Sequence, residues 1–190
     1  MIDPIIVALT GASGIGYGLR LLNVLTDLNY QIHLIISEGA EVVAQVEENF
    51  DLKTLQTNNK IKIFSEENIA APTASGSFKS LGMIICPCSV KTLGLIANGI
   101  EINLIVRAAS VCLKEKRKLI LVPRETPFSL PIIKNLEKSL LAGATILPAM
   151  PGFYHKPKTI SDLQNFIVGK ILDQFEINHN LYQRWGTNIK

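Results

Sequence analysis

The chain has 190 residues, of which 47% are hydrophobic and 18% are charged. This apolar content excludes an intrinsically disordered chain, and the length is typical of one domain of ~100–200 residues. The 19 Lys and Arg against 16 Asp and Glu leave a net charge of +3, too small to indicate a nucleic-acid or membrane partner. No apolar run approaches the ~20 residues that span a bilayer, and Asp3 and Pro4 interrupt any signal-peptide pattern. We therefore expect a soluble, cytoplasmic protein.

Strand-like and helix-like segments alternate along the chain. Short, continuous apolar runs such as Ile5 to Leu9 are typical of strands that are buried on both faces. The expected strands are residues 5–9, 31–36, 83–87, 119–122 and 145–147. The expected helices are residues 15–28, 40–48, a helix that begins after Ser89 as its N-cap, 103–115, 131–142 and 161–175.

Residues 52–79 form the least regular part of the sequence. They contain one short apolar piece, Ile61 to Phe64, to which we assign no element. Residues 70–77 are small and rich in helix breakers, which predicts a loop.

Strands that are separated by helices imply right-handed crossovers and a parallel sheet. The sequence therefore predicts one doubly wound α/β domain, Rossmann-like or flavodoxin-like, over residues 1–190 with helices on both faces of the sheet. A polar tail from about residue 176 carries Trp185.

Cysteine and histidine give no metal-site pattern. Cys86, Cys88 and Cys112 are an odd number without the spacing of a zinc or thioredoxin site, which favours small buried residues in a reducing compartment. The three histidines show no ligand spacing with one another or with the cysteines. We therefore expect no metal.

The turns that follow the expected strands point to an anionic ligand, because ligands of such sheets bind outside the carboxyl ends of the strands. The turn from Thr10 to Gly14 is rich in glycine and opens a helix, whose N-terminal amides favour phosphate. Its order is G-x-x-G-x-G, unlike the dinucleotide fingerprint, and Ser37 rather than an acid ends the second strand. These two points count against NAD and favour a mononucleotide such as FMN. The hydroxyl donors would be Ser13, Ser37, Ser89 and Thr92, each of which alone is equally a helix cap.

Charged residues near these turns have two interpretations each. Arg124 and Glu125 follow the fourth long strand directly, either as a surface pair or as a proton-transferring site. Arg107 and Lys114 are seven residues apart and share a helix face, which is either solvated or part of an anion site. Lys170 lies at the edge of an apolar arc, from which it can reach solvent or a phosphate.

Six motifs together closely resemble the flavin prenyltransferases of the UbiX type. They occur in the family's order from the first strand to the last helix, so the resemblance covers nearly the whole chain. The motifs are residues 11–14, 74–78, 87–92, 107–115, 123–127 and 151–157.

This resemblance implies a specific reaction. Family members join the dimethylallyl group of dimethylallyl phosphate to N5 and C6 of reduced FMN, without a metal. The prenylated FMN then serves a decarboxylase of the UbiD type. The resemblance also implies a homo-oligomer, typically a dodecamer, with active sites between subunits.

The resemblance further implies a role for each matching position. Ser13 and Glu125 would handle protons, and Arg107 and Lys114 would assist catalysis at the phosphate. The flavin site would comprise Gly11, Ala12, Ser13, Ser37, Ser89, Val90, Lys91, Thr92 and Arg124. Dimethylallyl phosphate would contact Arg107, Lys114, Tyr154, Lys170 and Trp185, with the tail of residues 176–190 closing over this site or over a neighbouring subunit.

Four positions depart from the family pattern. Asn68, Ile102 and Ser110 stand where family members commonly have acids. Lys170 replaces a frequent arginine, which keeps the charge and loses the two-pronged hydrogen bonding of a guanidinium.

Two other functions are alternatives. A related FMN-dependent decarboxylase of cysteine or phosphopantothenoylcysteine would carry the motif Pro-Ala-Ser-Ala-Asn-Thr, where this chain has Pro87-Cys-Ser-Val-Lys-Thr92. It would also carry an early histidine that is absent from residues 52–74. A non-catalytic flavin carrier would not need the cations or Glu125.

Overall fold

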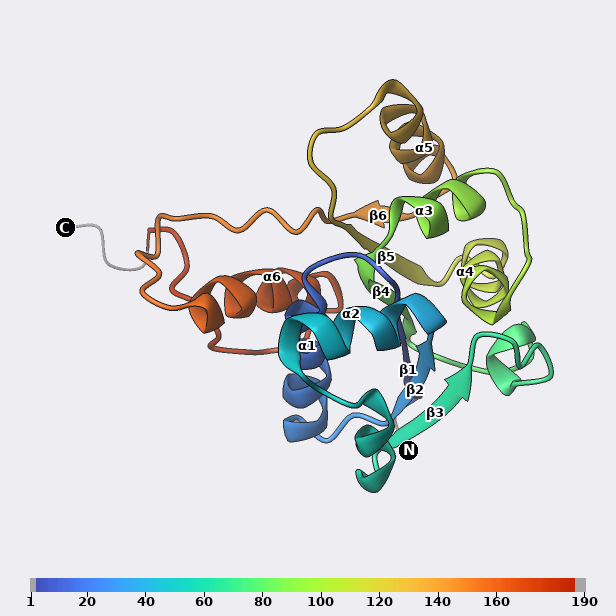
Figure 1. The fold of residues 1–190 in the computed structure, drawn as a ribbon, viewed down its shortest axis with the longest axis horizontal. Helices are drawn as coiled ribbons and strands as arrows, with labels where there is room; N and C mark the ends of the chain where they lie inside the picture. Colours follow the sequence, from blue (N-terminus) through green and yellow to red (C-terminus); the bar gives the residue numbers. More distant parts are fainter. Residues whose placement is uncertain (1–2, 187–190) are drawn as a thin grey trace.

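The computed structural model describes residues 3–186 (Figure 1). Its centre is a six-stranded sheet in the order β3-β2-β1-β4-β5-β6, in which every pair is parallel. The strands are β1 (Ile5–Leu9), β2 (Ile32–Ile36), β3 (Ile61–Ser65), β4 (Gly82–Cys88), β5 (Lys118–Pro123) and β6 (Thr145–Ile146). The chain moves outward from β1 to β3 and then returns to the other side of β1, so the strand order reverses between β1 and β4.

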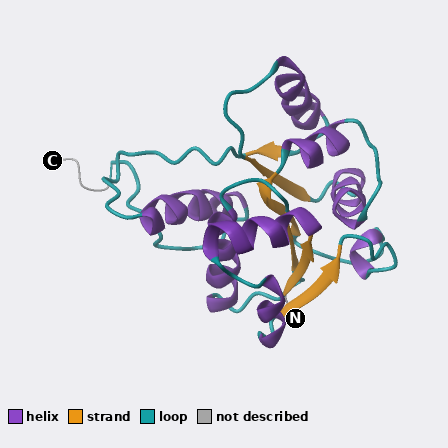
Figure 2. Cartoon of the chain, in the orientation of Figure 1, coloured by secondary structure: helices purple, strands orange, loops and turns teal. Residues whose placement is uncertain are grey.

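Helices cover both faces of the sheet (Figure 2), which confirms the expected doubly wound α/β fold. One buried cluster joins one sheet face to α1, α2 and α6, and a second joins the other face to α3, α4 and α5. The α-helices are α1 (Ile15–Asp27), α2 (Glu38–Glu48), α3 (Val90–Ala97), α4 (Leu104–Lys114), α5 (Leu130–Leu141) and α6 (Ile160–Gln174). Two short 3₁₀ helices are η1 (Leu52–Thr57) and η2 (Pro72–Ala74).

Side-chain caps start several of these helices. The Ser89 hydroxyl accepts a hydrogen bond from the Thr92 amide, which confirms Ser89 as the N-cap of α3. Ser37 caps α2 in the same way. At α6, Thr159 and Asp162 form a capping box, in which each side chain bonds the other residue's backbone amide.

Strand β3 is the main element that the sequence did not predict. It is an edge strand that pairs only with β2, and Lys62 and Ser65 along it are exposed. A short edge strand that is exposed to solvent along part of its length lacks the continuous apolar run of a central strand. The predicted loop at 70–77 also contains η2, and β6 is one residue shorter than expected.

The cysteines are free and buried, as their sequence context predicted. Burial raises the pKa of all three thiols, that of Cys88 to about 12 and that of Cys112 to about 11. Within residues 3–186, no helix is both long enough and apolar enough to cross a membrane.

Helix α1 packs against the sheet through Gly18. A Cβ atom at this position would lie 2.4 Å from the Cys86 carbonyl oxygen and 2.5 Å from Leu9 Cδ2. The Cys86 oxygen belongs to the backbone of β4, and the Leu9 side chain is fully buried, so neither can move aside without cost. The absence of a side chain at Gly18 therefore sets the distance between α1 and the strands that carry the two central turns.

We expect Gly18→Ala to lower the free energy of unfolding by about 1–3 kcal/mol, because it overpacks a rigid contact. Chemical denaturation measures this change. Gly94→Ala in α3 is the matched control, since its Cβ would meet only the Asn135 side-chain nitrogen at 3.3 Å. Equal stability of the two variants would contradict this account of the α1 contact.

Candidate active site

The two central turns of the sheet are tied together by Thr10. Its hydroxyl donates to the Pro87 carbonyl at 2.7 Å and accepts from the Ser89 amide at 2.8 Å. Thr10 is only 1% exposed, so these bonds lie in a protected environment. They fix the turn after β1 against the turn after β4, at the point where the strand order reverses.

A cavity of about 350 Å³ opens at this point. Six of the nine residues that we assigned to a flavin line it, namely Gly11, Ser37, Ser89, Val90, Lys91 and Thr92. Their hydroxyls, backbone amides and one ammonium suit a phosphate-bearing ligand. Glu38 and Glu66 also line the cavity, and the Glu66 carboxylate accepts from the Glu38 amide and the Asn103 side chain. The hydroxyl, amide and ammonium donors fit a flavin mononucleotide.

The hydroxyls in the cavity serve the helices as well. Ser37 accepts from the Ala40 amide at 3.1 Å, and Ser89 accepts from the Thr92 amide at 3.2 Å while it donates to the Thr92 hydroxyl at 3.0 Å. A hydroxyl that accepts a hydrogen bond keeps its own O–H to donate. Ser37 can therefore cap its helix and still donate to a ligand. Ser89 donates to Thr92, so at this turn the Thr92 hydroxyl is the donor available to a ligand.

The glycine-rich turn is occupied by a carboxylate of the chain itself. Glu47, on the last turn of α2, accepts hydrogen bonds from the Gly14 amide at 2.8 Å and the Ile15 amide at 3.1 Å. We expected these amides at the start of α1 to bind phosphate, and the structure commits them to Glu47. Sequence reasoning missed Glu47, because nothing near it in the chain marks it as the partner of a turn 32 residues away.

The surroundings of Glu47 favour its charged form. Partial burial by itself raises the pKa of this carboxyl, but hydrogen bonds from the Ser13 hydroxyl and the two amides, with the nearby Arg124 charge, outweigh it and lower the pKa. Glu47 therefore stays ionised beside Ser13.

Arg124 brings the end of β5 to the same edge. Its Nε donates to the Ser13 carbonyl oxygen at 3.1 Å. The adjacent Glu125 is half-buried, and its Oε1 accepts from the Thr126 amide at 2.9 Å. The structure thus brings together Ser13 and Arg124, which sequence reasoning had named, and Glu47, which it had not, while Glu125 is the neighbour of Arg124 in the chain.

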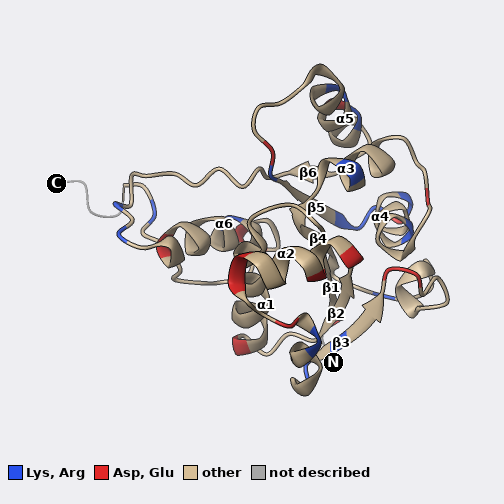
Figure 3. Ribbon diagram, in the orientation of Figure 1, with Lys and Arg blue, Asp and Glu red and all other residues tan. Residues whose placement is uncertain are grey.

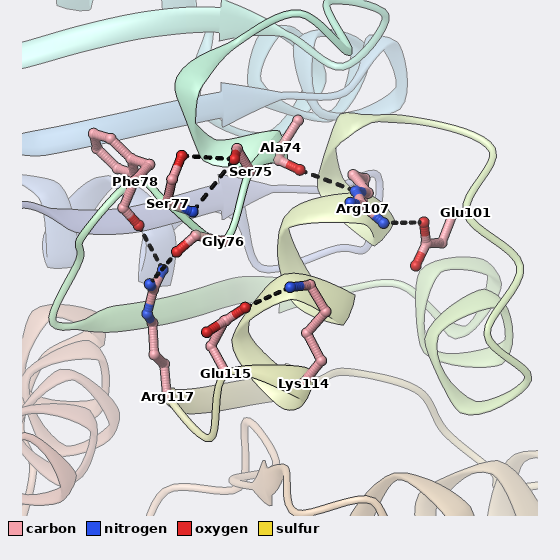
Figure 4. Close-up of polar contacts among 10 residues, drawn as sticks. All are labelled: Ala74, Ser75, Gly76, Ser77, Phe78, Glu101, Arg107, Lys114, Glu115 and Arg117. Carbon is pink, nitrogen blue, oxygen red and sulfur yellow. Dashed lines mark hydrogen bonds and ion pairs between the residues drawn. The ribbon is translucent and has the colours of Figure 1, made fainter.

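The expected phosphate-binding cations of α4 lie beside the loop 74–78 (Figure 4). Arg107 donates to the Ala74 carbonyl at 3.0 Å and pairs with Glu101 at 2.8 Å. Lys114 pairs with Glu115. The two cations project from one helix face, as their spacing predicted, and each has a carboxylate partner within the chain.

Arg117 holds the same loop from its other side. Its guanidinium donates to the carbonyl oxygens of Gly76 and Phe78, both at 2.6 Å. Ser110, one of the departures from the family pattern, hydrogen-bonds Glu101, and this bond helps lower the pKa of that carboxyl. Ile102, another departure, is 60% exposed.

The remaining expected substrate residues lie elsewhere. Tyr154 and Trp185 meet edge to face with ring centroids 5.3 Å apart, and the Lys170 ammonium lies 3.7 Å from Asp173. Lys170 is on α6, which covers the opposite face of the sheet from α4 (Figure 3). Within one chain, the two groups of expected phosphate ligands are therefore not brought together.

The fold and the cavity are those of a flavoprotein. A sequence profile of the Flavoprotein family matches residues 2–172, which includes all six strands and the lining of the cavity. Among residues 3–186, no group of three His, Cys, Asp or Glu side chains is arranged to hold a metal ion.

Relatives narrow this class to one family. The chain is 46% identical to the flavin prenyltransferase UbiX of Alkalihalophilus pseudofirmus, and the match covers 95% of this chain and 94% of the relative. The chain belongs to the flavin prenyltransferase family of the UbiX type.

Solved structures agree with this assignment. AnUbiX, crystallised in complex with FMN and dimethylallyl pyrophosphate, is 39% identical and superimposes with a TM-score of 0.95 over 100% of both chains. A dodecameric FMN-dependent UbiX-like decarboxylase from Escherichia coli O157:H7 is 38% identical, with a TM-score of 0.92 over 96% of this chain and 98% of the other.

Glu47→Ala should lower the free energy of unfolding at pH 7 by about 1 kcal/mol, because α1 loses the acceptor for two of its first amides. The folded-state pKa of Glu47 is depressed, so its stabilising effect is present above the ordinary Glu range and disappears as pH falls through the folded-state pKa. Denaturation at pH 7 and at successively lower pH should therefore show the unfolding free energies of wild type and Glu47→Ala converging. Glu48→Ala, which removes the adjacent exposed carboxylate, should show no such pH-dependent difference.

Proposed function

We propose that this chain transfers the dimethylallyl group of dimethylallyl phosphate to N5 and C6 of reduced FMN, with release of inorganic phosphate. The observation that carries the proposal is the cavity lined by six of the nine expected flavin residues, together with the bond of Arg124 to Ser13 in the turn that contributes Gly11 to this lining. The overall match to AnUbiX, which was crystallised with FMN and dimethylallyl pyrophosphate, supports FMN and a phosphorylated dimethylallyl donor.

Reduced FMN would supply the nucleophilic nitrogen and carbon, and it would be held in the cavity beyond the carboxyl ends of β1, β2 and β4. Ser37, Lys91 and Thr92 offer donors for its phosphate and ribityl oxygens. Gly11, Ala12, Val90 and Ser89 present backbone or small side chains, which allow a flat ring to approach. Arg124 extends this site toward the end of β5.

The cations make phosphate a better leaving group. As the allylic C–O bond breaks, its electron pair moves to the phosphate, and negative charge grows there. Fixed positive charges of Arg107, Lys114 and Lys170 stabilise that charge more than they stabilise the intact ester. Tyr154 adds a hydroxyl donor, and Trp185 supplies an apolar wall for the five-carbon group.

Ser13 and Glu125 move protons at the reacting centre. The bond at N5 replaces the C–O bond of the ester and the proton on N5. The bond at C6 then forms as the remaining prenyl double bond gains a proton, and C6 loses its own proton afterwards, so a positioned acid and carboxylate can supply and accept these protons. Glu47, which is hydrogen-bonded to Ser13, keeps the serine hydroxyl oriented.

Assembly completes the site. Because α4 and α6 cover opposite faces of the sheet, Arg107 and Lys114 of one chain would meet Tyr154 and Lys170 of another. The dodecamer of the similar Escherichia coli protein supports a homo-oligomer of this kind. Each chain would then be a single flavoprotein domain over residues 1–190, whose tail of residues 176–190 closes a shared site. Residues 187–190 lie outside the described part of the chain.

The product would be delivered to a UbiD-type decarboxylase. Family membership supports this partner, since prenylated FMN is a cofactor and not a metabolic end point. Three free, buried cysteines suit a reducing cytoplasm.

Anaerobic incubation with reduced FMN and dimethylallyl phosphate distinguishes the candidate functions. Prenyl transfer predicts release of phosphate and a flavin that is heavier by one prenyl unit. A flavin carrier would return FMN unchanged. In a parallel incubation with a peptidyl or phosphopantothenoyl cysteine in place of dimethylallyl phosphate, a cysteine decarboxylase would release carbon dioxide, and that result would overturn the proposal.

Glu125→Gln should lower kcat at least roughly 100-fold, the usual contribution of a general acid or base. FMN affinity should stay close to wild type, because no flavin contact is removed from the cavity. Stopped-flow absorbance and flavin titration measure the two quantities. Glu137→Gln, an exposed glutamate paired with Lys134 on α5, is the control. Equal turnover of Glu125→Gln and wild type would remove Glu125 from the mechanism.

Lys114→Met and Lys170→Met should each be nearly inactive alone and partly active when the two chains are co-expressed. If each site takes α4 from one chain and α6 from another, roughly a quarter of the sites in a mixed oligomer contain neither substitution. Phosphate release by the purified mixed oligomer measures the recovery. No recovery in oligomers that contain both chains would contradict a site shared between subunits.

A further inference from the structure

The end of α6 carries a carboxylate, Asp173, to which the reaction described above gives no role. Four side chains surround it, which are Lys170, His179, Tyr182 and Arg184. Three of these partners belong to residues 177–186, here called the tail segment. The Asp173 carboxylate therefore connects α6 to the part of the chain that carries Trp185.

Hydrogen bonds occupy both carboxylate oxygens. Oδ1 accepts from Arg184 Nη2 at 2.6 Å and lies 3.2 Å from His179 Nε2. Oδ2 accepts from the Tyr182 hydroxyl at 2.7 Å and from Arg184 Nη1 at 3.3 Å. The Leu181 amide donates to His179 Nδ1 at 3.2 Å, so Nε2 carries the hydrogen that faces Asp173.

Asp173 is charged under all ordinary conditions. Its partial burial alone raises the pKa, but hydrogen bonds from Arg184, Tyr182 and His179 lower it to about 2. One carboxylate here faces two permanent cations, Arg184 and Lys170. Arg184 makes the short contacts, and Asp173 orients the more distant Lys170 ammonium. The single negative charge of Asp173 does not neutralise both cations.

The tail segment also packs tightly on α6 at Gly169. A Cβ at this position would lie 2.6 Å from the Tyr182 ring and 2.7 Å from His179 Cε1. No side chain is tolerated there while the tail segment keeps its place. Gly169 thus offers a way to displace the tail segment that involves no charge.

A chain of aromatic contacts connects the tail segment to the expected substrate residues Tyr154 and Trp185. The Tyr182 ring is 5.0 Å from Phe166, Phe166 is 5.7 Å from Tyr154, and Tyr154 is 5.3 Å from Trp185, all between ring centroids. The first pair is tilted and the other two are edge to face, and aromatic pairs at such distances have preferred orientations. The position of Tyr182 therefore affects the positions of both Tyr154 and Trp185.

We propose that Asp173 is a positioning residue, whose carboxylate holds the tail segment and Lys170 together so that Lys170, Tyr154 and Trp185 form one preformed wall for the prenyl phosphate. Asp173 itself does not touch the substrate. This inference rests on the proposed function for its effect on the reaction, but its effect on the tail segment is independent of it.

Trp185 is the only tryptophan of the chain, so its fluorescence reports the tail segment directly. Because Trp185 is already 72% exposed, access to a quencher would change little, whereas rotational freedom would change strongly. We expect Asp173→Asn and Gly169→Ala to lower the anisotropy of Trp185 in the flavin-free protein. Glu176→Gln removes an exposed carboxylate three residues from Asp173 and should leave the anisotropy unchanged.

The kinetic constants test the consequence for the substrate. In Asp173→Asn and Gly169→Ala, KM for dimethylallyl phosphate should rise about tenfold, the size expected from losing an oriented charged contact, with a smaller change in kcat. KM for reduced FMN should stay close to wild type, because no residue of α6 or of the tail segment lines the cavity assigned to the flavin. Asp173→Glu, which keeps the charge, should recover part of the loss.

Three results would overturn the proposal. The first is unchanged Trp185 anisotropy in both variants, and the second is lower anisotropy with an unchanged KM for dimethylallyl phosphate. The third is an equal rise of both KM values, which would indicate a general loss of structure. If Asp173→Asn fails to fold by circular dichroism, Gly169→Ala alone decides, since it adds one methyl group at a helix position. If the wild-type protein shows no prenyl transfer, the proposed function is refuted. The anisotropy of Trp185 would still show whether Asp173 holds the tail segment.

Discussion

The convergence of parallel strands at one edge is the constraint on which the rest of this structure depends. All six strands point the same way, so the turns that follow them meet along a single line. The Thr10 hydroxyl fixes two of these turns to each other by bonding the backbone on both sides of the β4 turn. Gly18 sets how closely α1 approaches the same strands. A rigid crevice, built before any ligand arrives, follows from these contacts and avoids the entropic cost of ordering loops on binding.

Charge around the site is balanced within the chain. Glu101 and Glu115 pair with the cations of α4, and Asp173 faces Lys170 and Arg184. Such partners orient long side chains, while the partly exposed pairs contribute little to stability. Under the proposed function, a phosphate that enters the site would meet cations whose positions are already restricted. The carboxylates would also help the inorganic product to leave, because each cation could pair with its carboxylate again.

The sequence allowed the fold and much of the crevice to be predicted, for identifiable reasons. Ile5 to Leu9 is fully buried, and a buried strand has no polar residues to interrupt its pattern. Ser37 and Ser89 were found because caps and strand ends are local features. Strand β3 was missed because an edge strand is partly wetted and its pattern is mixed. Glu47 was missed because its partners, Gly14 and Ile15, are distant in the chain.

By itself, the sequence determined the alternation of strands and helices, the hydroxyl-rich turns and the motifs of a flavin prenyltransferase, since these depend on neighbouring residues and on residue type. Only the tertiary structure decided which charges meet. It placed Glu47 on the first turn, joined Arg124 to Ser13, and assigned α4 and α6 to opposite faces of the sheet. The physical reason is that a side chain's partner across the fold is set by crossover direction and helix packing, which involve the whole chain and leave no trace in a short segment.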